Sequence, residues 1–97
     1  MGEEYRIPFQ SQDQEALKKI LSSAPHFASY DQKYALYNYR ANIMASSAIM
    51  PDATAAVAEY GFYFCKKGNR EVERDVLAYI RSAVEASGQA FIIEDLE

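Results

Sequence analysis

Thiol and imidazole side chains, the usual partners in nucleophilic catalysis, occur once each in this 97-residue sequence, as Cys65 and His26. Cys65 follows Phe64 in an apolar segment, which is typical of a buried, inert thiol. His26 directly follows Pro25, where we expect a helix to end. A Gly-x-Ser-x-Gly nucleophile elbow does not occur. The sequence therefore favours a non-enzymatic protein and leaves catalysis by this one pair as an alternative.

Sequence patterns that bind metals and phosphate-bearing cofactors are also missing. One histidine and one cysteine cannot build a structural zinc site, and the acidic residues lack the spacing of a calcium loop. Neither Gly-x-x-x-x-Gly-Lys nor Gly-x-Gly-x-x-Gly is present. We therefore predict no metal and no cofactor.

A short basic run precedes the second expected helix, with Lys66, Lys67 and Arg70 around Gly68 and Asn69. Free backbone N–H groups and the helix dipole favour an anion at such a helix start. An ordinary polar turn between a strand and a helix explains the same residues. Both interpretations stay open, and the first predicts a small-ligand or anion-binding site.

Tyrosine is the other unusual feature, because the sequence has eight tyrosines and no tryptophan. A strand over 34–40 would place Tyr37 and Tyr39 on one face, and Tyr34 and Arg40 on the other. Tyrosines on a sheet face left uncovered by helices would suit contact with another protein, whereas tyrosines in the core would be structural. The predicted binding residues are Tyr34, Tyr37, Tyr39, Arg40, Tyr60, Tyr63, Lys66, Lys67 and Arg70.

One segment resembles the third-strand octapeptide of RNA-recognition domains. Tyr60–Lys67 has a glycine at its second position and aromatic side chains at Phe62 and Phe64. It lacks the basic first residue and the aromatic last residue of that motif. The net charge of −4 and the pI of about 5.0 also disfavour nucleic acid. The RNA alternative would use Tyr37, Tyr39, Phe62 and Phe64.

The expected elements begin with a short strand over 5–9. A helix follows, which begins at a Ser11–Gln14 capping box, has apolar residues at helical spacing between 16 and 24, and is ended by Pro25. A second helix begins after Asn69 and ends at Gly88, and a strand follows over 90–93. The secondary structure of residues 33–50 is ambiguous. We favour a strand over 33–40, although a helical stripe also fits it.

The strongest strand signal covers 54–67 and is interrupted by Gly61, which indicates a bulge or a hairpin. With a bulge, the element order predicts a single domain over 1–97 with a two-layer α+β sandwich. Its layout would be ferredoxin-like βαββαβ, with an antiparallel sheet and two helices on one face. A hairpin at Gly61 would add a strand and change this topology.

Charge is unevenly distributed along the chain. Residues 33–70 contain five basic and two acidic side chains, whereas residues 71–97 contain seven acidic and two basic ones. A single cysteine allows no intrachain disulfide, and the acidic first residues do not resemble a secretion signal. No apolar run approaches the roughly 18–20 residues that span a bilayer. We expect a cytoplasmic protein that does not enter a membrane.

The sequence thus predicts a small non-enzymatic protein-binding module of the adaptor, inhibitor or immunity type. It would act through a tyrosine-rich sheet face or edge, with a protein partner and as a homodimer. A small-ligand or anion-binding domain with weak enzymatic activity is the first alternative. Single-stranded RNA binding is the second.

Overall fold

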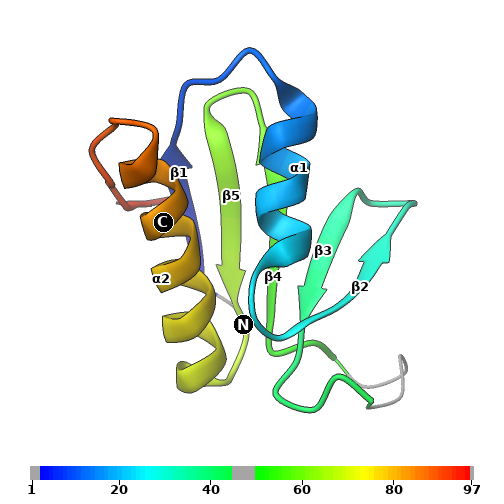
Figure 1. The fold of residues 1–97 in the computed structure, drawn as a ribbon. Helices are drawn as coiled ribbons and strands as arrows, with labels where there is room; N and C mark the ends of the chain where they lie inside the picture. Colours follow the sequence, from blue (N-terminus) through cyan, green and yellow to red (C-terminus); the bar gives the residue numbers. More distant parts are fainter. Residues whose placement is uncertain (1–2, 45–49, 97) are drawn as a thin grey trace.

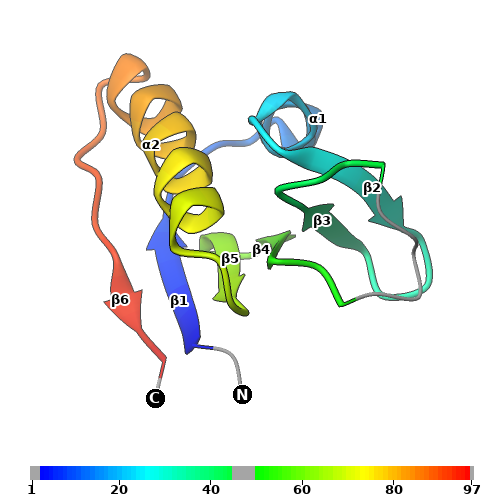
Figure 2. The ribbon, with the colours of Figure 1, turned by 90° about the horizontal axis from the view of Figure 1, so that it is seen from below.

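A computed structural model describes residues 3–44 and 50–96. Within these residues the chain forms one six-stranded sheet and two helices (Figure 1). The elements are β1 (Glu3–Pro8), α1 (Gln14–Ser23), β2 (Phe27–Asp31), β3 (Leu36–Tyr39), β4 (Ala53–Ala58), β5 (Gly61–Lys66), α2 (Arg70–Ala86) and β6 (Glu94–Asp95). The strand order is β2-β3-β4-β5-β1-β6, and every neighbouring pair is antiparallel. Figure 2 shows both helices on the same side of the sheet.

The α+β class and the antiparallel sheet with two helices on one face are confirmed, but the strand order and number differ from the ferredoxin-like layout. The chain follows the order βαββββαβ. Two features change the topology. Gly61 begins β5 after a tight turn, so the hairpin alternative holds, and β2 adds a strand that the sequence did not predict.

Both predicted helices are present, but the first begins differently from the expectation. The cap of α1 is Asp13, whose carboxylate accepts hydrogen bonds from the backbone N–H groups of Glu15 and Ala16 at 3.1 and 3.3 Å. The predicted Ser11 capping box is therefore wrong, and the Ser11 hydroxyl accepts from the Asp13 N–H instead. Asn69 caps α2 as predicted.

The strand predictions vary in accuracy. The first strand is confirmed as β1, and the strand alternative for 33–40 is confirmed in a shorter form, as β3. The C-terminal strand is wrong in position, because 90–93 form no strand and β6 begins at Glu94. A turn precedes β3 and includes Ala35 at φ +55°.

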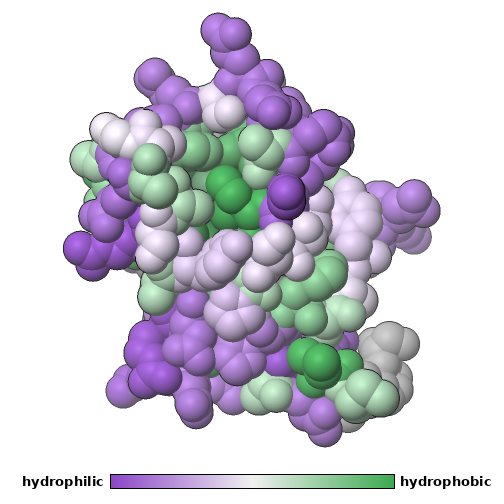
Figure 3. Space-filling model, viewed as in Figure 1, coloured by the Kyte–Doolittle hydropathy of each residue, from purple (hydrophilic) through white to green (hydrophobic). Residues whose placement is uncertain are grey.

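The hydrophobic core lies between the sheet and the helices. Phe62, Phe64 and Ile7 point toward the helices from β5 and β1 and are fully buried. Apolar side chains of both helices cover them, namely Val72, Val76, Ile80 and Val84 of α2 and Leu17 and Leu21 of α1. Figure 3 looks onto this helical side and shows apolar atoms in the hollow between α1 and α2. No helix in the described ranges 3–44 and 50–96 is long and apolar enough to cross a membrane.

Candidate functional site

The side of the sheet turned away from the helices is here called the open face. Alternation along the strands places small, polar and tyrosine side chains on it, opposite to the core residues. One cross-strand row runs Asn38–Thr54–Cys65–Glu4, and the next runs Ala56–Tyr63–Arg6–Glu94. The open face therefore joins residues from β1, β3, β4, β5 and β6 into one surface.

Hydrogen bonding orders the centre of the open face. The Tyr63 hydroxyl donates to Glu4 Oε1 at 2.5 Å, which ties β5 to β1. Burial, followed by this carboxylate, raises the pKa of Tyr63 above its ordinary value. The Tyr63 phenol is therefore neutral at physiological pH and acts as a hydrogen-bond donor rather than a base.

A groove of about 790 Å³ crosses the open face over β2, β3 and β4. Three lining residues are basic, namely Lys33, Arg40 and Lys67, and one is acidic, Asp31. The remaining lining residues are polar or apolar: Ser29, Tyr30, Gln32, Leu36, Asn38, Met50, Pro51 and Thr54. The groove lining thus carries a formal charge of +2 on a protein whose net charge is −4.

Backbone hydrogen bonds hold the basic end of the groove in place. The Arg40 N–H donates to the His26 carbonyl at 2.9 Å, and the Lys67 N–H donates to the Asp52 carbonyl at 3.1 Å. Arg40 is only 6% exposed, so its charged side chain is buried at this end of the groove. The Asp52 carboxylate accepts from the Ala41 N–H at 2.8 Å and lies beside this end without lining the groove.

The predicted binding residues do not lie together in the structure, but in the core, on the helical side, at turns and on the open face. Tyr37 and Tyr39 point toward the helices and are 7% and 0% exposed, so they lie in the core. Phe62 and Phe64 lie there too. The four rings on which the RNA alternative depended are therefore absent from the open face.

The predicted basic cluster is also divided. Lys66 points to the helical side, where its Nζ lies 3.3 Å from Glu73 and 3.7 Å from Glu3. Lys67 lines the groove on the opposite side, and Arg70 is exposed at the first turn of α2. Adjacent residues in a strand point to opposite faces, so the three charges do not form one site.

The remaining predicted tyrosines lie at turns or on the open face. Tyr34 is 62% exposed in the turn between β2 and β3, with Lys33 Nζ 5.2 Å from its ring centroid. Tyr60 lies in the turn between β4 and β5, under the Arg6 guanidinium at 4.6 Å. Together with Tyr63, they are the predicted tyrosines that lie away from the core.

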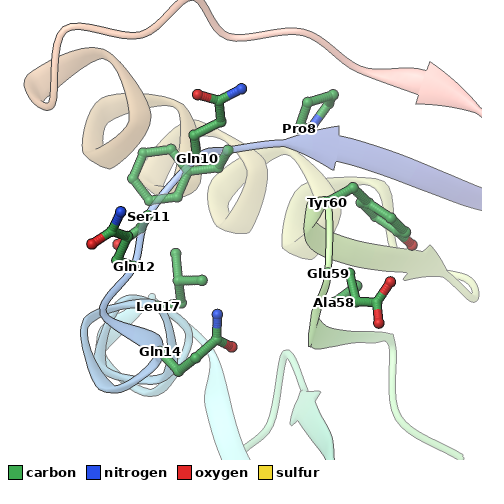
Figure 4. A pocket seen from close by; sticks show the side chains of 10 residues that line it. Pro8, Gln10, Ser11, Gln12, Gln14, Leu17, Ala58, Glu59 and Tyr60 are labelled. Atoms are coloured by element: carbon green, nitrogen blue, oxygen red, sulfur yellow. The ribbon is translucent and has the colours of Figure 1, made fainter.

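A second cavity, of about 690 Å³, lies between the β1–α1 connection and the β4–β5 turn (Figure 4). Leu17 and Gln14 point into it from α1, and the turn residues Ala58–Tyr60 line the other side. Among the described residues that line it, Glu59 is the charged one and Tyr60 is the predicted binding residue. The groove over β2–β4 therefore fits the predicted residues better.

The possible nucleophile and base do not meet. Cys65 belongs to the open face, whereas His26 Nε2 bonds Asp75 Oδ2 of α2 at 2.9 Å on the helical side. Within the described part of the chain, no three histidine, cysteine or acidic side chains are grouped in a way that could hold a metal ion.

Sequence reasoning missed several groove residues, including Lys33, Asn38 and Thr54. The pairing of strands could have revealed two of them: Asn38 of β3 pairs with Thr54 of β4 on one side and with Ser29 of β2 on the other. Recognising it required β2, which the sequence did not predict.

Comparisons with known proteins give no match: no family model, no curated protein and no solved structure resembles this chain significantly.

Proposed function

We propose that this protein is a protein-binding module that docks its partner on the open face of the sheet, and that a second copy of the chain is that partner. The observation that carries the proposal is the arrangement of both helices on one side of a six-stranded sheet (Figure 2). On the opposite face Ala56, Tyr63 and Leu36 are half-buried, and no helix of residues 3–44 and 50–96 lies over them. Small side chains and Tyr63 at its centre suit close contact with another sheet.

Charge favours a second copy as the occupant. Glu4 and Glu94 lie on β1 and β6 at one side of the open face, where Arg6 pairs with Glu94, whereas Lys33 and Arg40 lie at the groove on the other side, beside β2 and β3. A two-fold axis parallel to β4 and β5 would place β1 and β6 of each copy over β3 and β2 of its partner. The acidic side of one copy would then lie over the basic groove of the other, so the surface is self-complementary.

The size of the face sets the expected strength of the dimer. Five strand spacings and strands of about six residues give a face of about 24 by 20 Å. That is at most about 500 Å² per copy, near the lower limit for a specific interface. We therefore expect a reversible dimer with a micromolar rather than nanomolar dissociation constant.

The test is sedimentation equilibrium of the whole chain with a variant at the centre of the face. Ala56→Arg should weaken dimerisation at least about tenfold, since it sets like charges against each other on the two-fold axis. Ala78→Arg, the same change at an exposed position on α2, should leave it unchanged. A chain that stays monomeric up to millimolar concentration, or equal effects of the two variants, would contradict the proposal.

The cytoplasm is the compartment we propose for this function. Cys65 is the single cysteine of the sequence, and it is 6% exposed on the open face. A reducing compartment would keep this thiol free at a surface that is meant to bind protein. Fractionation of the native cell with an antibody to the chain would test the location.

A further inference from the structure

We propose that the groove over β2–β4 is also a binding site for a small organic phosphate of about the size of a nucleoside monophosphate. The proposal does not rest on self-association, because every residue that it uses belongs to one copy. The groove volume of about 790 Å³ lies within the range of ligand pockets, roughly 300–1,000 Å³.

The lysines of the groove have no acidic partners of their own. Among residues 3–44 and 50–96, neither Lys33 nor Lys67 forms an ion pair, whereas the neighbouring Lys66 contacts two carboxylates. Asp31 is the acidic residue that lines the groove, and its Oδ1 accepts from the Lys33 N–H at 3.0 Å. Two basic side chains that face the same concave surface without neutralisation favour an anionic ligand.

The end of the groove at Arg40 and Lys67 fits a phosphate group. Arg40 provides a permanent positive charge at this end of the groove, and its side chain is buried there. A guanidinium matches the geometry of phosphate oxygens. Lys67, which directly follows β5, adds an ammonium group on a flexible side chain. The Asp52 carboxylate beside this end bonds the Ala41 N–H, so part of its charge is already hydrogen-bonded.

The rest of the groove fits an uncharged organic body. Leu36 and Pro51 provide apolar walls, and Asn38 and Thr54 provide an amide and a hydroxyl from neighbouring strands. Between Leu36 and Arg40 the groove follows four residues of extended chain, about 13 Å. That length exceeds an inorganic phosphate ion and accommodates a phosphate with an attached ring system.

The experiment is an amide chemical-shift titration of the whole chain at low salt with AMP, inorganic phosphate and adenosine as probes. We expect AMP to shift the amides of Asn38, Thr54 and Lys67 saturably, and to bind at least about tenfold more tightly than either fragment. Protein concentrations at which sedimentation finds only monomer keep the result separate from dimerisation.

Single substitutions test which side chains of the groove bind AMP. Lys67→Ala should weaken AMP binding about fivefold or more, because it removes a cation without an acidic partner from the phosphate end of the groove, whereas Lys33→Ala, at the far end beyond Leu36, should weaken it less. Lys19→Ala removes an exposed lysine of α1 outside the groove and should have no effect. Absence of a saturable shift, equal affinity for AMP and inorganic phosphate, or equal weakening by Lys19→Ala would overturn the proposal.

Discussion

At the scale of single residues, Gly61 determines how β4 and β5 connect. Its φ is +136°, a backbone conformation that L side chains rarely adopt. An added Cβ would overlap the Phe9 nitrogen and the Ile7 carbonyl oxygen, both backbone atoms that cannot rotate away. The Phe9 N–H also donates to the Tyr60 carbonyl at 2.8 Å, which keeps β1 close to the turn.

Gly61→Ala should therefore lower the free energy of unfolding by about 2 kcal/mol or more, as expected for strain at a special backbone position. Urea denaturation measures this change. Gly68→Ala is the matched control, because no atom lies within 4 Å of an added Cβ there. If Gly68→Ala proved equally destabilising, the close approach of β1 would not be the cause.

Tyr39 shows that a predicted binding residue can have a structural role instead. It is fully buried, and its hydroxyl donates to the Leu21 carbonyl at 2.6 Å, in the last turn of α1. Burial raises the pKa of Tyr39, so the hydroxyl stays a donor at every pH of interest. The bond satisfies a carbonyl that a helix end leaves unpaired.

Tyr39→Phe should cost about 1–2 kcal/mol of unfolding free energy, because the buried Leu21 carbonyl loses its partner. Tyr34→Phe removes the same hydroxyl from a ring that is 62% exposed and should change little. Urea denaturation of both variants provides the comparison. Stability changes of equal size would show that burial of the Tyr39 hydroxyl is unimportant.

At the scale of elements, a polar contact joins His26, just before β2, to α2. His26 Nε2 donates to Asp75 Oδ2 at 2.9 Å, and Arg74 contacts the other oxygen of the same carboxylate at 3.1 Å. The hydrogen bond from His26, with a smaller contribution from Arg74, lowers the pKa of Asp75 below its ordinary 3.8. The ionised carboxylate is thus favoured by folding.

This contact predicts a pH dependence of stability. A lowered pKa gives stability that is complete above the ordinary value of 3.8 and is lost as pH falls through the lower folded value. Asp75→Asn should therefore be less stable than the wild type near pH 6, and the difference should shrink below about pH 4.

Urea denaturation of both proteins as a function of pH measures this dependence. Glu85→Gln, which removes an exposed ion pair with Arg81 on the same helix, controls for the loss of a surface charge. A pH-independent difference between wild type and Asp75→Asn would contradict the linkage.

Helices and strands could be predicted from the sequence where nearby residues are enough to determine them. The apolar stripe of α2 and its Asn69 cap are local, and so is the glycine that begins β5. The strand β2 is not local: Phe27–Asp31 are held by pairing with β3 and by a turn with Ala35 at positive φ. Pairing across a sheet depends on register, which a single strand's residues do not specify.

The candidate site was predictable only in part for the same reason. Lys67 and Arg40 were identified from the local excess of positive charge. Their separation from Lys66 depends on the exact start of β5, because a shift of one residue exchanges the two faces of a strand. The burial of Tyr37 and Tyr39 depends on which face the helices cover, and this is a property of the whole sheet.

At the scale of the whole molecule, the uneven charge of the sequence becomes a polarity of the open face. Its acidic side includes Glu94 on β6, and its basic side includes Lys33 in the turn after β2. In the proposed dimer each acidic side meets the partner's basic side, and the pairing occurs twice because of the two-fold symmetry. Added salt should therefore weaken dimerisation, because the charges are close to solvent.

A charge exchange tests this arrangement. Glu94→Lys and Lys33→Glu should each weaken homodimerisation by about tenfold, because β6 of one copy lies over β2 of the other, next to Lys33, and each change places like charges opposite one another at two symmetric positions. An equal mixture of the two variants should form a heterodimer more readily than either variant forms a homodimer. In that heterodimer the introduced lysine faces the introduced glutamate in one contact region, and the original Glu94 and Lys33 face each other in the second. Sedimentation of each variant and of the mixture measures the difference.

Glu85→Lys, at an exposed position of α2, is the control and should leave dimerisation unchanged. A mixture that associates no better than its components would contradict the face-to-face arrangement.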